Sequence, residues 1–586
     1  MIMNLAAIEH KCNFNYCYAL NDDTIIIKLR TGKEVKSAYI ICEDPYVNGI
    51  SGKTPWDGKK EKMPLVVELE HHLLWEIRIV PQYKRLQYYF EINSDDEAAV
   101  IYENRIILKT SEEQDRCSKQ YFKFPWMNSK DMIKPPIWVR NVVWYQIMPD
   151  RFHRGIDFEN SGKFRNWDDT SNMTYADFYG GNIKGIEGKL DYIRELGFTG
   201  IYLTPVFQSA SNHKYNTTDY ELIDPDFGTE NDFKRLIDCA HKKGIKIMID
   251  AVFNHCGTGF FAWKDVVEKG EASSYYDWFF INSDQFITDD YKTKDGRYFS
   301  FAFEAAMPKL NTNNESVINY FIDLCTYWIR NWNIDGIRFD VGNEISHYFI
   351  KRLHISLKKI KPDIFLLGEI WHDAAPWLEG DEYDSVMNYP FYYCLNDFWA
   401  DKSMNSKQFM YSMNYCLNLY SGQTNTVLFN FLDTHDTARV MDTCESPDIL
   451  LQKLAVLMTM PGSPCIYYGT EIAMQGKCSP YNRQPMPWAE ITNGRFAILI
   501  NEFKRIINIR HNYIQLKNGY LEWNHREDHS RLLHYKRVAE TEKTKINIII
   551  NAESNSIDLQ ANGNLIYSRN YYNNRLLANG IIIFEE

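Results

Sequence analysis

The sequence lacks any apolar run of the roughly 20 residues needed to cross a lipid bilayer. The N-terminus, MIMNLAAIEHKCNFNY, lacks the basic start and apolar core of a secretion signal. No cluster of Lys and Arg is present, and the formal net charge is -12. These absences argue against a membrane protein, a secreted protein and a nucleic-acid-binding protein. We therefore expect a protein of the cytoplasm, and the charge fits a neutral ligand at least as well as an anionic one.

Cysteine is scattered without a pattern. The 12 Cys run from Cys12 to Cys478 and include no C-x-x-C pair, which excludes the usual zinc spacings and a dense disulfide framework. Isolated thiols are typical of a reducing compartment. A chain of 586 residues is long enough for several domains with large apolar cores. We expect no required cofactor.

The pattern of apolar residues changes twice along the chain. Residues 1–130 hold short alternating runs such as TIIIKLRT, SAYIICE, LLWEIRIV and LQYYFEI, separated by turn residues. This pattern predicts an N-terminal β-sandwich. From about residue 512 similar runs return as LHYKRV, KINIII and GIIIFEE. Residues 512–586 are therefore predicted to form a C-terminal antiparallel β-sheet domain.

Between these regions, residues 131–511 alternate short apolar runs with amphipathic helical stretches. The runs are VVWYQIMP, FTGIYLTP, IKIMIDAVFNH, IDGIRFD, IFLLGEI, DSVMNYP, NTVLFNFLDTHD and PCIYYG. Buried strands alternating with helices predict a parallel sheet, and eight strands are the number that a (β/α)8 TIM barrel needs. A longer excursion at about 256–311 is predicted to form a small inserted lobe.

Polar side chains follow several of the predicted barrel strands. In a barrel of this kind the active site lies at the C-terminal ends of the strands. The candidate groups at these ends are Asp250, Asn254, His255, Arg338, Asp340, Glu369, Asp433, His435 and Asp436. Any single carboxylate there is well explained as a helix cap or a structural ion pair. The convergence of several favours acid/base chemistry on a neutral substrate.

Asp340 and Glu369 suit the roles of nucleophile and general acid in a retaining glycosidase. Such an enzyme needs these two carboxyl groups about 5–5.5 Å apart. Arg338 lies two residues before Asp340, so strand alternation places both on one face. The guanidinium is expected to keep Asp340 ionised as a nucleophile. Ile370 and Trp371 follow Glu369 and provide an apolar wall. Such a wall favours the protonated form that a general acid needs.

These strand ends lie in segments that resemble the four signature segments of the α-amylase family, in the same order. They are DAVFNH (250–255), GIRFDVGNE (336–344), GEIW (368–371) and FLDTHD (431–436). MPKLN (307–311) resembles the fifth segment of the branch that contains neopullulanase, maltogenic amylase and cyclomaltodextrinase. WYQIMPDRF (144–152), YGGNIKGI (179–186) and SNHKYNTTDY (211–220) resemble that branch too. The resemblance extends over nearly the whole chain.

The resemblance implies a role for each matching residue. Asp340 is implied as the covalent nucleophile, Glu369 as the general acid and base, and Asp436 as the third carboxylate. The implied substrate-binding residues are Arg338, His255, His435, Tyr215, Asn343, Glu344 and Arg483. Asp250 and Asp433 are expected to be structural. The implied substrate is an α-glucan.

Several departures from the family pattern affect these expectations. Where many relatives carry a calcium loop, this chain has HRGIDFENSG, and Asn182 replaces the usual Asp. We expect no required calcium; should calcium bind, the candidate ligands are Asp157, Glu159 and Asn160. Gly342 replaces the usual Ala, and Ile350 stands where the family pattern has Trp. These changes leave open the balance of α-1,4 against α-1,6 cleavage and of hydrolysis against transglycosylation.

The resemblance implies a retaining hydrolase of α-1,4 and some α-1,6 bonds in cyclomaltodextrins, pullulan and maltooligosaccharides. It also implies a homodimer whose N-terminal domains narrow the partner's active site; a carbohydrate-binding role for that domain stays open. One alternative is an oligo-1,6-glucosidase, which MPKLN disfavours, and another is an open-cleft α-amylase. A non-catalytic carbohydrate-binding homologue is disfavoured because Asp340, Glu369 and Asp436 are all present.

Overall fold

The structure is a computed structural model that describes residues 2–13, 15–50, 56–109, 119–156, 158–159, 162–283, 292–524, 530–539 and 541–586. Its contacts divide the chain into two compact units. The first consists of Met1–Lys134, Leu378–Gly380 and Lys407–Asn425. The second consists of Pro135–Trp377, Asp381–Ser406 and Thr426–Glu586.

The first unit contains two antiparallel sheets packed face to face. One has the order β1–β2–β6–β5, with β1 (Cys17–Ala19), β2 (Ile25–Gly32), β5 (Leu65–Glu68) and β6 (His72–Ile79). The other has the order β4–β3–β7–β8–β9, and β10 also pairs with β7. Its strands are β3 (Ser37–Glu43), β4 (Lys59–Met63), β7 (Leu86–Asn93), β8 (Ala98–Tyr102), β9 (Arg105–Leu108) and β10 (Phe122–Phe124). Ile25, Ile27 and Leu29 alternate into the core between the sheets. The predicted sandwich is confirmed.

A segment distant in sequence packs against this sandwich. It carries α9 (Ser406–Cys416) and α10 (Gly422–Asn425). The Asn414 side chain donates to the backbone carbonyl of Glu68 at 2.9 Å, and the N–H of Gly422 donates to the Tyr18 hydroxyl at 3.0 Å. The first unit is therefore completed by residues from between two barrel strands.

The second unit is built on eight parallel strands in the order β18–β17–β16–β15–β12–β11–β20–β19. They are β11 (Trp144–Ile147), β12 (Gly200–Leu203), β15 (Lys246–Ala251), β16 (Gly336–Phe339), β17 (Phe365–Gly368), β18 (Ser385–Val386), β19 (Phe429–Phe431) and β20 (Ser463–Tyr467). A parallel bridge between Met387 and Phe429 joins the two end strands. All eight predicted runs form barrel strands, so the predicted TIM barrel is confirmed.

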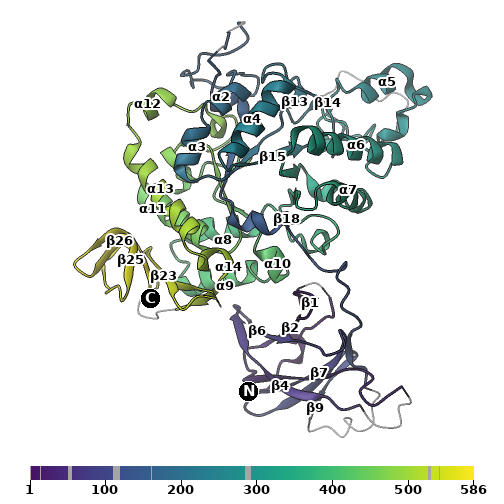
Figure 1. Ribbon diagram of the computed structural model, residues 1–586, viewed down its shortest axis with the longest axis vertical. Coiled ribbons are helices and arrows are strands. Elements are labelled where there is room, and N and C mark those ends of the chain that lie inside the picture. The colour runs from purple at the N-terminus through teal and green to yellow at the C-terminus, as the bar shows by residue number, and fades with distance from the viewer. Residues whose placement is uncertain are drawn as a thin grey trace. The chain divides into compact units, whose positions relative to one another are not determined.

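Amphipathic helices cover the outside of the barrel (Figure 1). In α4 (Glu230–Lys242), Thr229 and Asp232 form a capping box at the N-terminus, and Phe233, Leu236 and Ile237 are buried. The other helices of this unit are α1 (Pro149–Phe152), α2 (Ile183–Glu187), α3 (Leu190–Leu196), α6 (Glu315–Trp332), α7 (His347–Ile360), α8 (Tyr389–Ala400), α11 (Pro447–Thr459), α12 (Trp488–Thr492), α13 (Ala497–Asn512) and α14 (Gln515–Asn518). No helix in the described part of the chain is long and apolar enough to span a membrane.

Two insertions extend the C-terminal ends of the strands. A hairpin of β13 (Phe207–Ser209) and β14 (Thr217–Ile223) follows β12. The predicted lobe follows β15 and contains α5 (Phe261–Lys269) and the 3-10 turns η4 (Gly270–Ala272), η5 (Tyr276–Trp278) and η6 (Phe301–Phe303). Further 3-10 turns in this unit include η7 (Gly342–Glu344), directly after β16. The loops that bear the candidate site are thus anchored on the barrel.

The chain ends in an antiparallel sheet with the order β21–β22–β23–β26–β24, and β25 also pairs with β26. Its strands are β21 (Tyr520–Trp523), β22 (Leu532–Val538), β23 (Lys545–Asn551), β24 (Ile557–Asp558), β25 (Asn564–Tyr572) and β26 (Arg575–Glu585). Ile549 and Ile582 are buried in its core. The predicted C-terminal β-sheet domain is confirmed.

At the N-terminal end of the barrel, the buried carboxylate of Asp335 precedes β16. It accepts hydrogen bonds from His241 at 2.6 Å, Lys246 at 2.9 Å, Lys361 at 3.4 Å and the N–H of Ile247 at 3.0 Å. Burial alone raises the pKa of Asp335, but these donors outweigh burial and hold the pKa below its usual range. The ion pairs therefore stabilise the folded barrel.

We predict that Asp335→Asn lowers the free energy of unfolding by about 3 kcal/mol at neutral pH, because it leaves buried donors without their charged partner. A carboxylate with a lowered folded-state pKa stabilises above its unfolded value of about 3.9, and this contribution is lost as the pH falls. The difference in the free energy of unfolding between wild type and variant, measured by urea denaturation, should therefore be smaller at about pH 3 than at about pH 6. Asp191→Asn, which removes an exposed partner of Lys243, is the control. Equal losses in both variants would contradict the prediction.

Candidate active site

The buried guanidinium of Arg338 joins carboxylates from three neighbouring strands. Its Nη1 donates to both oxygens of Asp250 at 2.8 and 2.9 Å, and to Oδ1 of Asp340 at 2.9 Å. Its Nη2 lies 2.8 Å from Oε2 of Glu369. Asp250 and Arg338 are register partners on β15 and β16, and Glu369 directly follows β17. The parallel register therefore brings the three acids to one cation.

This cluster contains more carboxylates than cations. Burial raises the pKa of Asp340 well above its usual range; Arg338 opposes this effect, while the carboxylates of Glu369, Asp250 and Asp436 add to it. Burial also raises the pKa of Asp250 against the effect of Arg338. Arg338 thus acts in the predicted direction on Asp340, but burial outweighs it. One guanidinium therefore serves several buried carboxylates.

A chain of hydrogen bonds runs from Asp250 through Tyr215 to His435. The Tyr215 hydroxyl donates to Oδ2 of Asp250 at 2.8 Å and lies 2.7 Å from Nε2 of His435. The Gln146 amide donates to Nδ1 of His435 at 2.8 Å. Burial lowers the pKa of His435 well below its usual range, so the ring is neutral and its hydrogen is on Nε2. That nitrogen lies 3.1 Å from Oδ2 of Asp436.

The backbone after β16 is strained where it meets Glu369. Val341 has φ 47° and ψ 46°, a left-handed conformation that is costly for a β-branched residue. Its N–H donates to Oε2 of Glu369 at 2.9 Å. At Gly342 an added Cβ would lie 3.0 Å from the Tyr383 hydroxyl, which donates to the Gly342 carbonyl at 3.1 Å. Tyr383 therefore occupies the space that a larger residue at position 342 would need.

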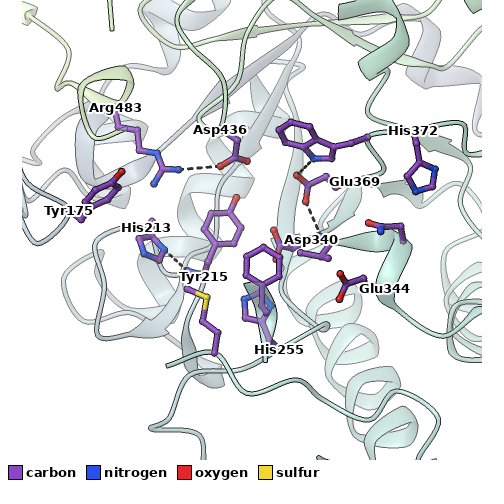
Figure 2. A pocket seen from close by; sticks show the side chains of 15 residues that line it. Tyr175, His213, Tyr215, His255, Asp340, Glu344, Glu369, His372, Asp436 and Arg483 are labelled. Atoms are coloured by element: carbon purple, nitrogen blue, oxygen red, sulfur yellow. Dashed lines mark hydrogen bonds and ion pairs between the residues drawn. The ribbon is translucent and has the colours of Figure 1, made fainter. Parts of the chain in front are cut away.

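Above these groups lies a cavity of about 510 Å³, a size typical of small-molecule sites. The sequence-predicted residues that line it are Tyr215, His255, Asp340, Asn343, Glu344, Glu369, Asp436 and Arg483. Arg338 and His435 are fully buried next to it. Figure 2 shows Asp340, Glu369 and Asp436 facing a common space, with Arg483 on one side and Glu344 on the other. All ten predicted site residues are therefore at or directly beneath the cavity.

Two cations fix the rim of the cavity. Nη2 of Arg483 lies 3.2 Å from Oδ1 of Asp436, and its Nε donates to the backbone carbonyl of His435 at 2.9 Å. Nζ of Lys309, from MPKLN, lies 3.0 Å from Oε2 of Glu344 and also bonds to Asn254. These contacts therefore hold Asp436 and Glu344 in place on opposite sides of the cavity before any ligand binds.

Two models of known protein families match this chain. The family model described as alpha amylase, catalytic domain, matches residues 146–551, and the one described as alpha amylase, N-terminal ig-like domain, matches residues 3–128. The chain belongs to the α-amylase family. It is a glycoside hydrolase, as predicted.

Its relatives lie in the branch that the motifs predict. The chain is 39% identical to the intracellular maltogenic amylase of Bacillus subtilis (strain 168), over 92% of this chain and 89% of that protein. It is 35% identical to neopullulanase 2 of Thermoactinomyces vulgaris, over 95% and 93%. A solved cyclomaltodextrinase structure matches with a TM-score of 0.88 at 31% identity, covering 100% of this chain and 98% of that one.

Sequence reasoning missed several residues that line the cavity of this glycoside hydrolase. They are Tyr175, His213, Phe301, Met307 and His372. His213 and Met307 lie within two of the family-like segments, SNHKYNTTDY and MPKLN, so the signal was present. Tyr175 and Phe301 come from loops without such a signal. Phe301 stacks on the ring of His255, with centroids 4.9 Å apart and an interplanar angle of 17°.

The stretch that replaces the family's calcium loop is only partly described, and the expectation that no calcium is required stays a prediction. Oδ1 of Asn182 accepts two backbone N–H groups, at 2.8 and 2.9 Å, and caps α2. Within the described ranges, no group of three His, Cys, Asp or Glu side chains could hold a metal ion. Glu159 is exposed, and Asp157 and Asn160 lie outside the described residues. Asn182 thus serves as a helix cap.

We predict that Arg338→Lys lowers kcat/KM by about 10³-fold, because an ammonium group cannot replace the planar fork that contacts three carboxylates. The measurement is reducing-end release from a maltooligosaccharide, with thermal unfolding measured alongside. Arg352→Lys changes an exposed ion pair with Glu315 and should leave activity unchanged. Activity of Arg338→Lys within tenfold of wild type would contradict the proposed dependence on one guanidinium.

Proposed function

We propose that the enzyme hydrolyses α-1,4 and some α-1,6 glucosidic bonds in cyclomaltodextrins, pullulan and maltooligosaccharides, with retention of configuration and some transglycosylation. The observation that carries this proposal is the placement of Asp340 and Glu369 on one guanidinium beside the cavity. The names of the relatives, which include a cyclomaltodextrinase and a neopullulanase, support the substrate class.

The reaction proceeds in two displacements. A carboxylate oxygen of Asp340 attacks the anomeric carbon, the bond to the leaving oxygen breaks, and Glu369 donates its proton to that oxygen. A glycosyl ester on Asp340 results. Water then attacks the same carbon and gives a proton to Glu369, and the ester bond breaks to restore Asp340. Two inversions retain the configuration, and a sugar hydroxyl in place of water gives transglycosylation.

The remaining groups suit the binding of a neutral sugar. Burial lowers the pKa of His255 to about 3, and Lys309 acts in the same direction, so this ring is neutral. Its Nε2 has no hydrogen-bond partner among the described residues. Tyr215 offers an aromatic surface at the cavity wall, and Asp436 accepts hydroxyl groups.

The first test is reducing-end release from cyclomaltodextrin and from soluble starch at equal mass. We expect faster cleavage of cyclomaltodextrin, and a fall of about 10⁴-fold or more in Asp340→Asn and Glu369→Gln, which lose the nucleophile and the acid. NMR of the first product should show the α-anomer. A β-anomer would overturn the two-step mechanism. Faster starch cleavage would favour an open-cleft α-amylase, and no release from either would favour an α-1,6-specific enzyme or a non-catalytic homologue.

We also propose that the enzyme is a cytoplasmic homodimer. The intracellular relative from Bacillus subtilis supports the location, and the resemblance to its branch supports the dimer. Light scattering at working concentration should give twice the chain mass of 69.2 kDa. A mass equal to one chain would contradict the dimer and would remove the reason to expect a narrowed active site.

A further inference from the structure

The two oxygens of the Glu369 carboxylate have different neighbours. Oε2 lies 2.8 Å from Nη2 of Arg338 and accepts the N–H of Val341 at 2.9 Å. Oε1 accepts the indole N–H of Trp371 at 3.0 Å. A proton on Oε2 would point at a cation and a fixed backbone donor. The proton of the general acid therefore belongs on Oε1.

The indole of Trp371 is held in place by packing. Its ring stacks on Tyr389, with centroids 4.1 Å apart and an interplanar angle of 18°. Tyr389 is fully buried at the start of α8 and packs edge-on against Phe431 of β19. Trp371 itself is 42% exposed and lines the cavity. Its N–H is thus aimed at Glu369 before a substrate arrives.

We propose that Trp371 is a positioning residue for the general acid, and that its indole N–H orients Oε1, the oxygen that delivers and recovers the proton. This inference rests on the proposed function. The N–H occupies one lone pair of Oε1, which leaves the proton on that oxygen directed at the leaving group. As the glycosidic bond breaks, the proton moves from Oε1 to the leaving oxygen. The attacking water later returns a proton to the same atom.

Trp371→Phe isolates this hydrogen bond, because it keeps an aromatic ring and removes the N–H. The other titratable groups that face Glu369 come from β12, the end of β16, the segment after β19 and α8. They are Tyr202, Arg338, Asp340, His435 and Tyr389, together with Asp436 across the cavity. None of them changes in this variant. A change in pH dependence would therefore report the lost N–H.

The test compares two substrates over a range of pH. Cleavage of maltotriose needs a protonated leaving oxygen, whereas the nitrophenolate of 4-nitrophenyl α-maltoside leaves without one. For Trp371→Phe we expect kcat/KM on maltotriose to fall about 30-fold, and on the aryl glycoside by less than about threefold. Because Glu369 loses a hydrogen-bond donor, the alkaline limb of the maltotriose profile should also differ from that of wild type.

Trp138→Phe is the matched control, since it removes an indole N–H that donates to the backbone carbonyl of Asp363 at 2.9 Å. That bond lies at the opposite end of the barrel, and the variant should keep both the substrate ratio and the pH profile of wild type. Equal losses of Trp371→Phe on both substrates, with the alkaline limb unmoved, would overturn the inference. Failure of the proposed function would instead appear as wild-type inactivity on both substrates.

Discussion

The active site depends on one buried cation, the guanidinium of Arg338, and on the carboxylates that surround it. A buried charge is costly unless its partners are close and well oriented, and loss of one partner leaves the others uncompensated. Asp250 and Asp340 accept hydrogen bonds from Nη1 of Arg338, and Glu369 lies beside Nη2 of the same guanidinium. The strand register of β15, β16 and β17 sets these distances. The closed barrel is thus the condition for the chemistry.

Asp335 and Asp340, at the two ends of the barrel, have opposite electrostatic surroundings. Asp335, at the N-terminal end, faces two lysine ammonium groups and the His241 imidazole, and its pKa is lowered. Asp340, at the C-terminal end, shares one cation with other carboxylates, and its pKa is raised by burial and by those neighbours. The same side chain is therefore a stabilising anion in one place and one of several carboxylates around a single guanidinium in the other. Environment, more than residue type, assigns the role.

The eight barrel strands could be predicted because each is a short, continuous apolar run, and the strand-end residues followed because parallel strands end at one face. Strand β4 was missed, since its sequence KKEKM is a charged, largely exposed edge strand without apolar alternation. Tyr175 and Phe301 were missed because loop packing, which no periodicity encodes, brings them to the cavity. The association of residues 407–425 with the N-terminal sandwich is likewise a long-range contact.

Sharing one guanidinium creates a further constraint. Asp340 and Glu369 need different properties, yet any change in the charge or position of Arg338 alters both. Independent control must come from groups that contact only one of them. The strained N–H of Val341 and the indole N–H of Trp371 contact Glu369 and are neutral, so they orient its two oxygens without adding charge to the cluster. A left-handed backbone conformation at Val341 costs on the order of 1–3 kcal/mol. This cost is accounted for when the Val341 N–H holds Oε2 of Glu369, the oxygen that must not carry the proton.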